Sequence, residues 1–340
     1  METLLQLRYD EAQARLRAKV KAWVPNLDED LPFILVTHRH PDTDAYACLW
    51  KAVRFIVGDS EYKVVLLPAG VPLPDEDRVG HRVLEMDTGG GPLDQHGKGL
   101  TDTSSFKLMC EHYGFHTDEG LWPFIKLTVA TDRAEQVDRL SLHYQLRGLA
   151  NYHRDHTSNE IDWGTCCQRA FEMFDILYNQ ETSRLQSAVN LHKLSKRYTL
   201  ENGMNVCLLW GNPQLRDAAF EDGADVVMWT ILKRKHFQVG IALNRNAPNA
   251  VEKGMLSVVS AIRIAEAKAR GIDAAGHDLR ATGPNKYFGG WYAHPGENGG
   301  TRLILCGSKK APLEPEERTK LSWDQLCAIV NGRLGNDNLW

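Results

Sequence analysis

A histidine and two aspartates stand close together in the first part of the sequence, and their types and spacing could bind a metal ion. His38, Asp42 and Asp44 form an HxxxDxD pattern after the apolar run PFILVTH, which predicts a β-strand. Open parallel sheets bind ligands beyond the carboxyl ends of their strands. The aspartates point the same way if the stretch is extended, so with the histidine they predict a metal half-site. The alternative is a capped helix start, in which an aspartate accepts backbone N–H groups.

A second set of candidate ligands follows along the chain: Asp87, Asp94, His96 and Asp132. Asp87 ends RVLEMD, a predicted strand, and the glycines after it allow a tight turn. Asp132 ends the apolar run KLTVATD. One aspartate in such a place is weak evidence, because turns and helix caps use the same residue. If these carboxylates meet those of the first segment from separate strand ends, each pair about 4 Å apart would repel by roughly 4 kcal/mol, and bound cations would relieve the repulsion.

Ligands of these types restrict the choice of cation. Carboxylate oxygens with one or two imidazoles favour Mn²⁺ or Mg²⁺, as one or two ions, while Zn²⁺, Co²⁺ and Fe²⁺ stay open. The 7 cysteines are scattered and contain no CxxC pair, so neither a disulfide framework nor a structural zinc site is indicated. We therefore expect a reducing, cytoplasmic environment.

The elements that must position these residues alternate between strands and helices, which predicts an α/β fold. A surface helix is predicted at residues 10–24. Strands of a mainly parallel sheet are predicted at residues 32–38, 63–68 and 82–87, and flanking helices at 45–57, 104–114, 123–132 and 135–152. The pattern over residues 166–197 predicts a long helix that leads into a second, smaller α/β domain.

The second α/β set begins after a predicted helix stop at residues 201–203. Its strands are predicted at residues 205–210, 225–232 and 236–243, and its helices from Pro213 and over 252–271. We place the metal-binding domain with its linker helix at residues 1–195 and the substrate-binding domain at 200–340. The net charge of −4 argues against a general nucleic-acid coat protein. No stretch approaches the roughly 20 apolar residues of a membrane span, so no membrane partner is expected.

The segment HRHPDTDA, the strand-terminal Asp87, the triplet Asp94-Gln95-His96 and Asp132 together resemble the DHH phosphoesterase superfamily in order and spacing. That superfamily includes RecJ-type exonucleases, oligoribonucleases, cyclic-dinucleotide phosphodiesterases, family II inorganic pyrophosphatases and Myg-type exonucleases. The glycine-containing stretch before the triplet is most similar to the Myg-type pattern. The resemblance covers roughly residues 33 to 135 and implies a divergent, Myg-type exonuclease-like member with DQH in place of DHH.

The resemblance implies a role for each matching position. His38 and Asp42 would hold one metal, Asp44 and Asp132 the other, and Asp87 would bridge them. Asp42, Asp87 and His96 would be the catalytic residues, with His96 at the second histidine of the triplet and also a metal ligand. Gln95 stands where the family has its first histidine. Either a single metal binds, or His96 takes over the ligand role, or the site keeps its fold without catalysis.

Basic residues beside these motifs are candidates for binding phosphate, because they would neutralise charge on the phosphoryl group. Arg39, His40, Lys98 and Arg133 adjoin the motifs. Basic side chains are mostly solvated at the surface, which is the alternative for the two arginines and the lysine, and His40 could instead cap the loop. In the second domain, the glycine- and aromatic-rich stretch 289–302 loosely resembles a substrate element of the family. Its candidates are His294, Arg302 and the nearby Lys309. A hairpin with an incidental histidine is the alternative there.

The leading hypothesis is a metal-dependent hydrolase of phosphoester or phosphoanhydride bonds. Its expected partner is a phosphorylated small molecule, a nucleotide or a short nucleic acid, and a homodimer is considered as its assembly state. The rival hypothesis is a catalytically impaired protein of the same fold that acts as a binding or regulatory module, which Gln95 supports. A plain nucleotide-binding domain is weakly supported, because no GxGxxG or GxxxxGK[ST] loop follows a predicted strand.

Overall fold

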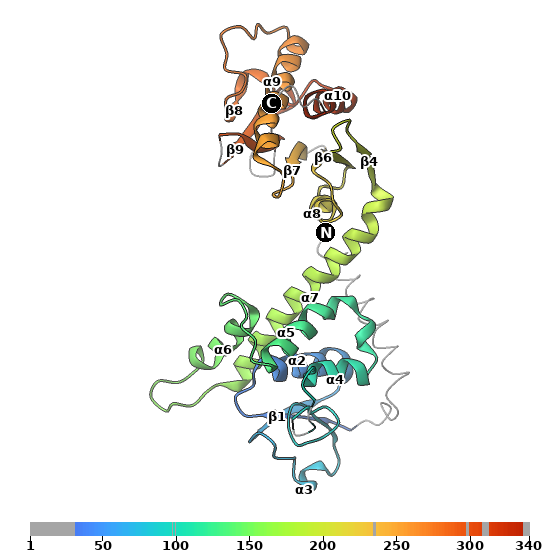
Figure 1. Cartoon of the computed structure of the whole chain (residues 1–340). Coiled ribbons are helices and arrows are strands. Elements are labelled where there is room, and N and C mark those ends of the chain that lie inside the picture. Colours follow the sequence, from blue (N-terminus) through green and yellow to red (C-terminus); the bar gives the residue numbers. More distant parts are fainter. Residues whose placement is uncertain are drawn as a thin grey trace. The chain divides into compact units, whose positions relative to one another are not determined.

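The computed structural model describes residues 31–96, 98, 100–233, 236–296, 299–307 and 313–335. The chain forms two compact units that divide between Ser183 and Arg184, and each unit is described by itself (Figure 1). The helix predicted at residues 10–24 lies outside the described residues. Among the described helices, none is both long enough and apolar enough to cross a lipid bilayer.

The first unit is built on a sheet of three parallel strands. Strand β1 (Phe33–His38) lies between β2 (Tyr62–Leu67) and β3 (Arg82–Glu85), and all three predicted strands are confirmed. Residues 34–36 of β1 have no exposed surface, as expected for a central strand covered on both faces. In the β1–β3 register, Val36 pairs with Glu85. His38, the last residue of β1, and Asp87, two residues after β3, therefore lie beside each other at this edge of the sheet.

Helices flank this sheet, and most of them contribute side chains to the larger hydrophobic core. They are α2 (Thr43–Lys51) with the π-helical η1 (Ala52–Val57), α3 (Asp75–Arg78), α4 (Ser105–His112), η2 (Phe115–Thr117), η3 (Glu119–Leu121), α5 (Trp122–Asp132), α6 (Leu142–Tyr152) and α7 (Trp163–Leu194). Buried Trp50 of α2 stacks on Phe174 of α7 at 5.2 Å and contacts Phe124 of α5 at 5.8 Å. A smaller apolar cluster of Ile34 and Val36 with Leu73 lies in the same unit.

Two sequence predictions in this unit need correction. The helix predicted from residue 135 begins only at Leu142, because Ala134 has a positive φ of 54° and Ser141 is extended. The expectation that the acidic side chains come from separate strand ends is also wrong. Only Asp87 follows a strand, whereas Asp42 caps helix α2, Asp44 lies in its first turn and Asp132 ends helix α5.

The second unit contains a mixed sheet of seven strands in the order β4-β5-β6-β7-β10-β9-β8. These strands are β4 (Ser195–Thr199), β5 (Asn205–Trp210), β6 (Val226–Lys233), β7 (His236–Leu243), β8 (Gly283–Asn285), β9 (Trp291–Pro295) and β10 (Thr301–Cys306). Only β5 and β6 pair in parallel. The hairpin expected in the alternative for residues 289–302 is present, because β9 and β10 pair antiparallel, and the substrate role of this stretch stays a prediction.

The helices of the second unit are η4 (Pro213–Leu215), α8 (Arg216–Glu221), α9 (Asn249–Arg270), η5 (Lys286–Phe288), η6 (Pro315–Glu317) and α10 (Trp323–Leu334). The two longest, α9 and α10, pack apolar side chains into a core shared with the sheet. Met255, Val258 and Ile262 repeat at helical spacing on α9 and share a core with Ile241 and Ile304 of the sheet. The predicted α/β class, with a long helix between two sheets, is confirmed.

Candidate metal centre

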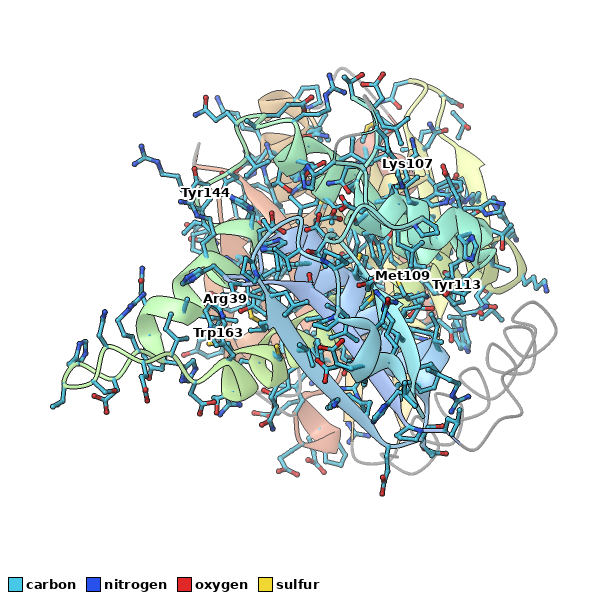
Figure 2. All side chains as sticks on the ribbon, turned by 90° about the horizontal axis from the view of Figure 1, so that it is seen from below. Arg39, Lys107, Met109, Tyr113, Tyr144 and Trp163 are labelled. Carbon is cyan, nitrogen blue, oxygen red and sulfur yellow. The ribbon has the colours of Figure 1, made fainter. Side chains whose placement is uncertain are left out.

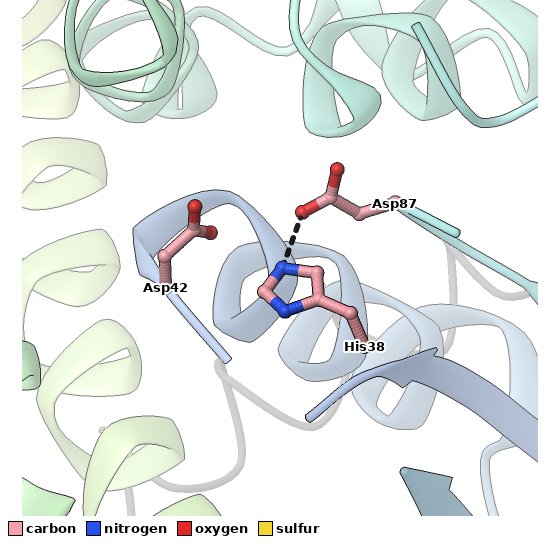
Figure 3. Close-up of side chains that lie close together, drawn as sticks. All are labelled: His38, Asp42 and Asp87. Atoms are coloured by element: carbon pink, nitrogen blue, oxygen red, sulfur yellow. Dashed lines mark hydrogen bonds and ion pairs between the residues drawn. The ribbon is translucent and has the colours of Figure 1, made fainter. Parts of the chain in front are cut away.

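His38 and Asp87 form the centre of the candidate site. The His38 Nε2 atom lies 3.0 Å from Asp87 Oδ2, and Nδ1 lies 2.9 Å from the backbone carbonyl of Arg39 (Figure 3). An Nδ1–H bond to a carbonyl fixes the imidazole so that Nε2 points at the carboxylate, which is the usual orientation of a metal-binding histidine. Asp87 and His40 both have positive φ angles, of 56° and 58°. Such backbone conformations are costly outside glycine and cluster at functional sites.

Asp42 completes a group of possible ligands. Its Oδ1 accepts the backbone N–H groups of Asp44 and Ala45, at 2.9 and 3.1 Å, so the capping alternative holds for this residue. Capping does not remove it from the cluster, because His38, Asp42 and Asp87 each offer a ligand atom within 4.8 Å of the others (Figure 3). Asp42 is exposed while Asp87 is buried. A cation could therefore reach this group from solvent and meet one imidazole and two carboxylates.

His96 and Asp94 form a second group with Asp87. Their ligand atoms also lie within 4.8 Å of one another, and His96 Nε2 is 3.3 Å from Asp87 Oδ1. Asp94 shapes the loop, because its carboxylate accepts the backbone N–H groups of Gly90 and of His96 itself. Gly90 has a φ of 69°, which explains the need for glycine in this turn. The loop thus brings His96 back to the end of β3.

Asp44 is buried, and its carboxylate is engaged at the start of another helix. Its Oδ2 accepts the backbone N–H of Ser105 at 2.7 Å and its Oδ1 that of Phe106 at 2.9 Å. Both donors lie in the first turn of α4, where unpaired N–H groups favour a negative charge. Asp44 belongs to neither group of possible ligands in the described part of the chain. Its role as a metal ligand stays a prediction.

Gln95 lies between Asp87 and Asp132. Its side-chain nitrogen Nε2 donates to Asp132 Oδ2 at 2.9 Å and to Asp87 Oδ1 at 3.4 Å. Its carbonyl oxygen accepts the hydroxyl of Ser105 at 2.5 Å. Burial and the nearby charge of Asp87 raise the pKa of Asp132, although the hydrogen bond from Gln95 lowers it. Acidic side chains thus lie close to Asp87, as predicted, and the side-chain amide of Gln95 lies between two of them.

The electrostatics of the site depend on the Asp87 carboxylate. Burial opposes the charged form of His38, but its hydrogen bond to Asp87 and the neighbouring carboxylates raise its pKa to about 9. The hydrogen bond to Asp87 likewise raises the pKa of His96 to about 9. Burial opposes ionisation of Asp87, yet bonds from both histidines hold its pKa well below the ordinary value. A cation that binds here would have to displace protons from the imidazoles.

The predicted phosphate-binding residues of this unit have different surroundings. Arg133 is paired with Asp102 at 3.2 Å and with Glu135 at 3.1 Å, and Lys98 donates to the carbonyl of Gly91. A cavity of about 560 Å³ beside the site is lined by Gln95, His96, Leu100, Thr101, Asp102, Asp132 and Arg133. Arg133 is thus placed at a cavity next to His96, while its charge is already balanced by two carboxylates.

Arg39 and His40 lie between His38 and Asp42 in the sequence and do not line that cavity. Both are exposed, and the His40 ring contacts the Trp163 ring edge-on at 5.2 Å. Arg39 and Trp163 are labelled on the same flank of the unit in Figure 2. No hydrogen bond of the described residues ties down the Arg39 guanidinium, so it is open to a ligand from solvent. The phosphate-binding roles of both residues stay predictions.

The predicted residues of the second unit are placed as follows. Arg302 donates to the carbonyls of Asn244, Arg245 and Ala247 and pairs with buried Glu252 at 3.0 Å, so it holds the loop before α9. His294 is exposed on β9, with its ring 5.6 Å from that of Tyr292. Lys309 lies outside the described residues. Substrate binding by these three residues stays a prediction.

Two residues of the site were missed in the sequence. Ser105 bonds Gln95 and has its hydroxyl 3.3 Å from Asp87 Oδ1. A serine at a helix start suggests a cap, and nothing in its spacing points to the acidic cluster. His143 of α6 has Nδ1 2.8 Å from the hydroxyl of Thr43, next to Asp42. A lone histidine so far along the chain gave no signal, because only the packing of α6 on α2 brings it here.

No protein-family model and no curated protein matches the sequence. Among solved structures the chain is similar to PggH of Vibrio cholerae, a pGpG-specific phosphodiesterase, at 13% identity over 88% of this chain and 99% of that chain, with a TM-score of 0.28. It is similar to the DHH domain of a member of a ribosomal protein family, at 12% identity over 98% and 92%, with a TM-score of 0.29. A candidate family II inorganic pyrophosphatase from Methanococcus jannaschii follows, at 12% identity over 65% and 90%, with a TM-score of 0.15. All three scores are low, so the functional assignment rests on the geometry of the site.

Proposed function

We propose that this chain is a metal-dependent phosphoesterase of the DHH superfamily that hydrolyses a phosphoester or phosphoanhydride bond. Its substrate would be a nucleotide, a short nucleic acid or another small phosphorylated compound. One observation carries the proposal: His38, Asp42 and Asp87 place an imidazole nitrogen and two carboxylate oxygens within 4.8 Å of one another. The Nδ1 bond of His38 to a backbone carbonyl supports it, because that bond leaves Nε2 to face the cluster.

These side chains fit Mn²⁺ or Mg²⁺, which prefer oxygen ligands and accept imidazole. When bound, such a cation would polarise a phosphoryl oxygen and lower the pKa of a coordinated water. His96 would then meet the substrate, because its side chain is 65% exposed and lines the cavity beside the site. Its Nε2 faces Asp87, which would keep the imidazole oriented. The other ring nitrogen, Nδ1, would then carry the proton that donates a hydrogen bond to a phosphoryl oxygen or to the leaving group.

Hydrolysis can be tested with the purified chain and a panel of phosphorylated compounds. The panel contains pyrophosphate, a nucleoside bisphosphate, a 5′-phosphorylated dinucleotide and a single-stranded oligonucleotide, each with and without Mn²⁺. Release of mononucleotides from an oligonucleotide end would identify the exonuclease type. We expect at least one compound to be hydrolysed with Mn²⁺, and Asp42→Ala and Asp87→Ala to reduce this to background. The matched control is Asp217→Ala, which removes a carboxylate that is 77% exposed on α8.

Full activity in folded Asp42→Ala and Asp87→Ala proteins would contradict the proposal. The alternative function is a binding or regulatory module without catalysis, and the amide of Gln95 among the carboxylates favours it. This alternative predicts that the natural chain hydrolyses none of the compounds, while Gln95→His gains Mn²⁺-dependent activity.

A further inference from the structure

The side-chain nitrogen of Gln95 is surrounded by atoms of the kind that bind metals. It lies 2.9 Å from Asp132 Oδ2, 3.2 Å from His96 Nε2 and 3.4 Å from Asp87 Oδ1. A divalent cation can be coordinated by such a set of atoms, which consists of two carboxylate oxygens and one imidazole nitrogen around a single point. In this chain the point is taken by an amide group that is 3% exposed.

The orientation of this amide follows from its neighbours. Its oxygen accepts the hydroxyl of Ser105, which can donate, whereas ionised carboxylates can only accept. If the amide were reversed, its oxygen would face Asp132 and Asp87 without a proton between them. The two N–H groups of Gln95 therefore go to the two carboxylates. His96 Nε2 cannot both donate to Asp87 and accept from Gln95, so we place its proton on the bond to Asp87.

The remaining acids near this point, Asp94 and Asp44, are also engaged, and Asp94 accepts the backbone N–H groups of Gly90 and His96. Both oxygens of Asp44 accept backbone N–H groups at the start of α4, and one of these donors belongs to Ser105. Ser105 thus connects Asp44 to Gln95 through its N–H and its hydroxyl. The carboxylates of Asp132 and Asp44 thus accept hydrogen bonds from neutral groups of the protein, which are the Gln95 amide and the backbone of α4. In the group of His38, Asp42 and Asp87, two backbone N–H groups bond Asp42 Oδ1, but no hydrogen bond among the described residues engages Asp42 Oδ2, which stays available to a cation.

We propose that this chain binds one divalent cation, at His38, Asp42 and Asp87, and that the Gln95 amide occupies the position a second cation would take between Asp87, Asp132 and His96. This inference rests on the metal centre of the proposed function. It assigns Gln95 a definite task, which is to replace a positive charge by two N–H donors. His96 is then left free to bind the substrate instead of a metal.

Metal stoichiometry tests the inference without any activity measurement. The full chain is stripped with EDTA and titrated with Mn²⁺ by calorimetry, and the bound manganese is counted by mass spectrometry and examined by electron paramagnetic resonance. We expect one Mn²⁺ per chain, with the spectrum of an isolated ion. Gln95→His should raise this to two, with the spectrum of an exchange-coupled pair. The matched control, Gln168→His, adds the same imidazole on the exposed side of α7 and should stay at one.

Each outcome decides between the two proposals. Two ions in the natural chain would overturn the inference and leave the metal centre intact, whereas no ion would overturn the metal centre as well. A Gln95→His protein that still binds one ion would show that the amide is not what excludes the second. If Gln95→His does not fold, Asp132→Asn replaces it. That variant should bind one Mn²⁺ with affinity changed less than about threefold, whereas Asp42→Asn should lose at least about tenfold, and equal losses would contradict the inference.

Discussion

Replacing Asp87 by asparagine should remove a pH-dependent part of the stability of the metal-free protein. The size of this stabilisation follows from the pKa of His38. Burial lowers that pKa, but the pairing with Asp87 outweighs burial and raises it from 6.5 to about 9. A shift of this size corresponds to roughly 3 kcal/mol, and solvent screening reduces it to about 2 kcal/mol because the side chain stays 15% exposed. His96 adds little, because its side chain is 65% exposed.

The sign of the pH dependence is set by the direction of this shift. The folded pKa of His38 lies above the unfolded value, so the stabilisation is fully present below pH 6.5 and is lost as the pH rises through about 9. The pKa of Asp87 is lowered in the folded state, so its share is present above about pH 4 and is lost only in stronger acid. The stabilisation therefore extends from about pH 4 to the pKa of His38 near 9.

The assay is urea unfolding in EDTA, followed by tryptophan fluorescence at about pH 6.5 and about pH 10. The difference in unfolding free energy between the natural chain and Asp87→Asn should shrink by about 2 kcal/mol over this range. Other titrating groups, such as Lys51 with its pKa lowered by burial to about 8, act in both proteins and cancel in the difference. The control Asp217→Asn should show no such change. A difference that stays constant with pH would refute the pairing of His38 with Asp87.

Three further predictions follow from the surroundings of single residues. Asp44→Ala should lower the unfolding free energy by at least about 2 kcal/mol with or without Mn²⁺, because two buried N–H groups of α4 lose their acceptor. The control Asp102→Ala, at an 81% exposed side chain, should change the unfolding free energy by less than about 0.5 kcal/mol. Equal effects of the two substitutions in urea unfolding would contradict this prediction. Lys51 is fully buried, and its Nζ has no hydrogen-bond partner in the part of the chain that the structure describes but lies 3.4 Å from the ring centre of Phe55. Lys51→Met should therefore raise the melting temperature at pH 7, and a fall would show that the cation–π contact dominates. A centre with one cation neutralises less charge than one with two, so the rate of hydrolysis with Mn²⁺ should be at least about tenfold higher for a phosphodiester than for pyrophosphate, and the reverse order would argue for a second ion.

The sequence was sufficient to predict the parts of the site that depend on strand ends. The run before His38 is continuously apolar from Phe33 to Val36, as expected of a central parallel strand, whereas Glu85 interrupts the run before Asp87. Parallel pairing of the two strands brings His38 and Asp87 to one edge of the sheet. The tasks of Asp42 and Asp44 could not be decided from sequence. An aspartate beside a helix start can bind a cation or accept backbone N–H groups, and only the packing of α4 against α2 shows that Asp44 does the latter.

Gln95 shows a second limit of prediction from sequence. The sequence shows that Gln95 stands where the family has a histidine. Three consequences were consistent with this: a single metal ion, a ligand role for His96, or a fold without catalysis. The choice among them depends on the direction in which the amide points. That direction is set by the Ser105 hydroxyl and by Asp132, which come from two different helices. Such a network forms only in the folded unit, so residue types and spacing cannot specify it.

The position of the cation is the central claim, and anomalous X-ray scattering at the manganese edge tests it most directly. Crystals of the natural chain grown with Mn²⁺ should give a single strong peak in the metal-binding unit, within coordination distance of His38 Nε2 and of carboxylate oxygens from Asp42 and Asp87. An anomalous difference map without a peak at these three side chains would contradict the account. So would a peak between Asp87 and Asp132, at the position of the Gln95 amide.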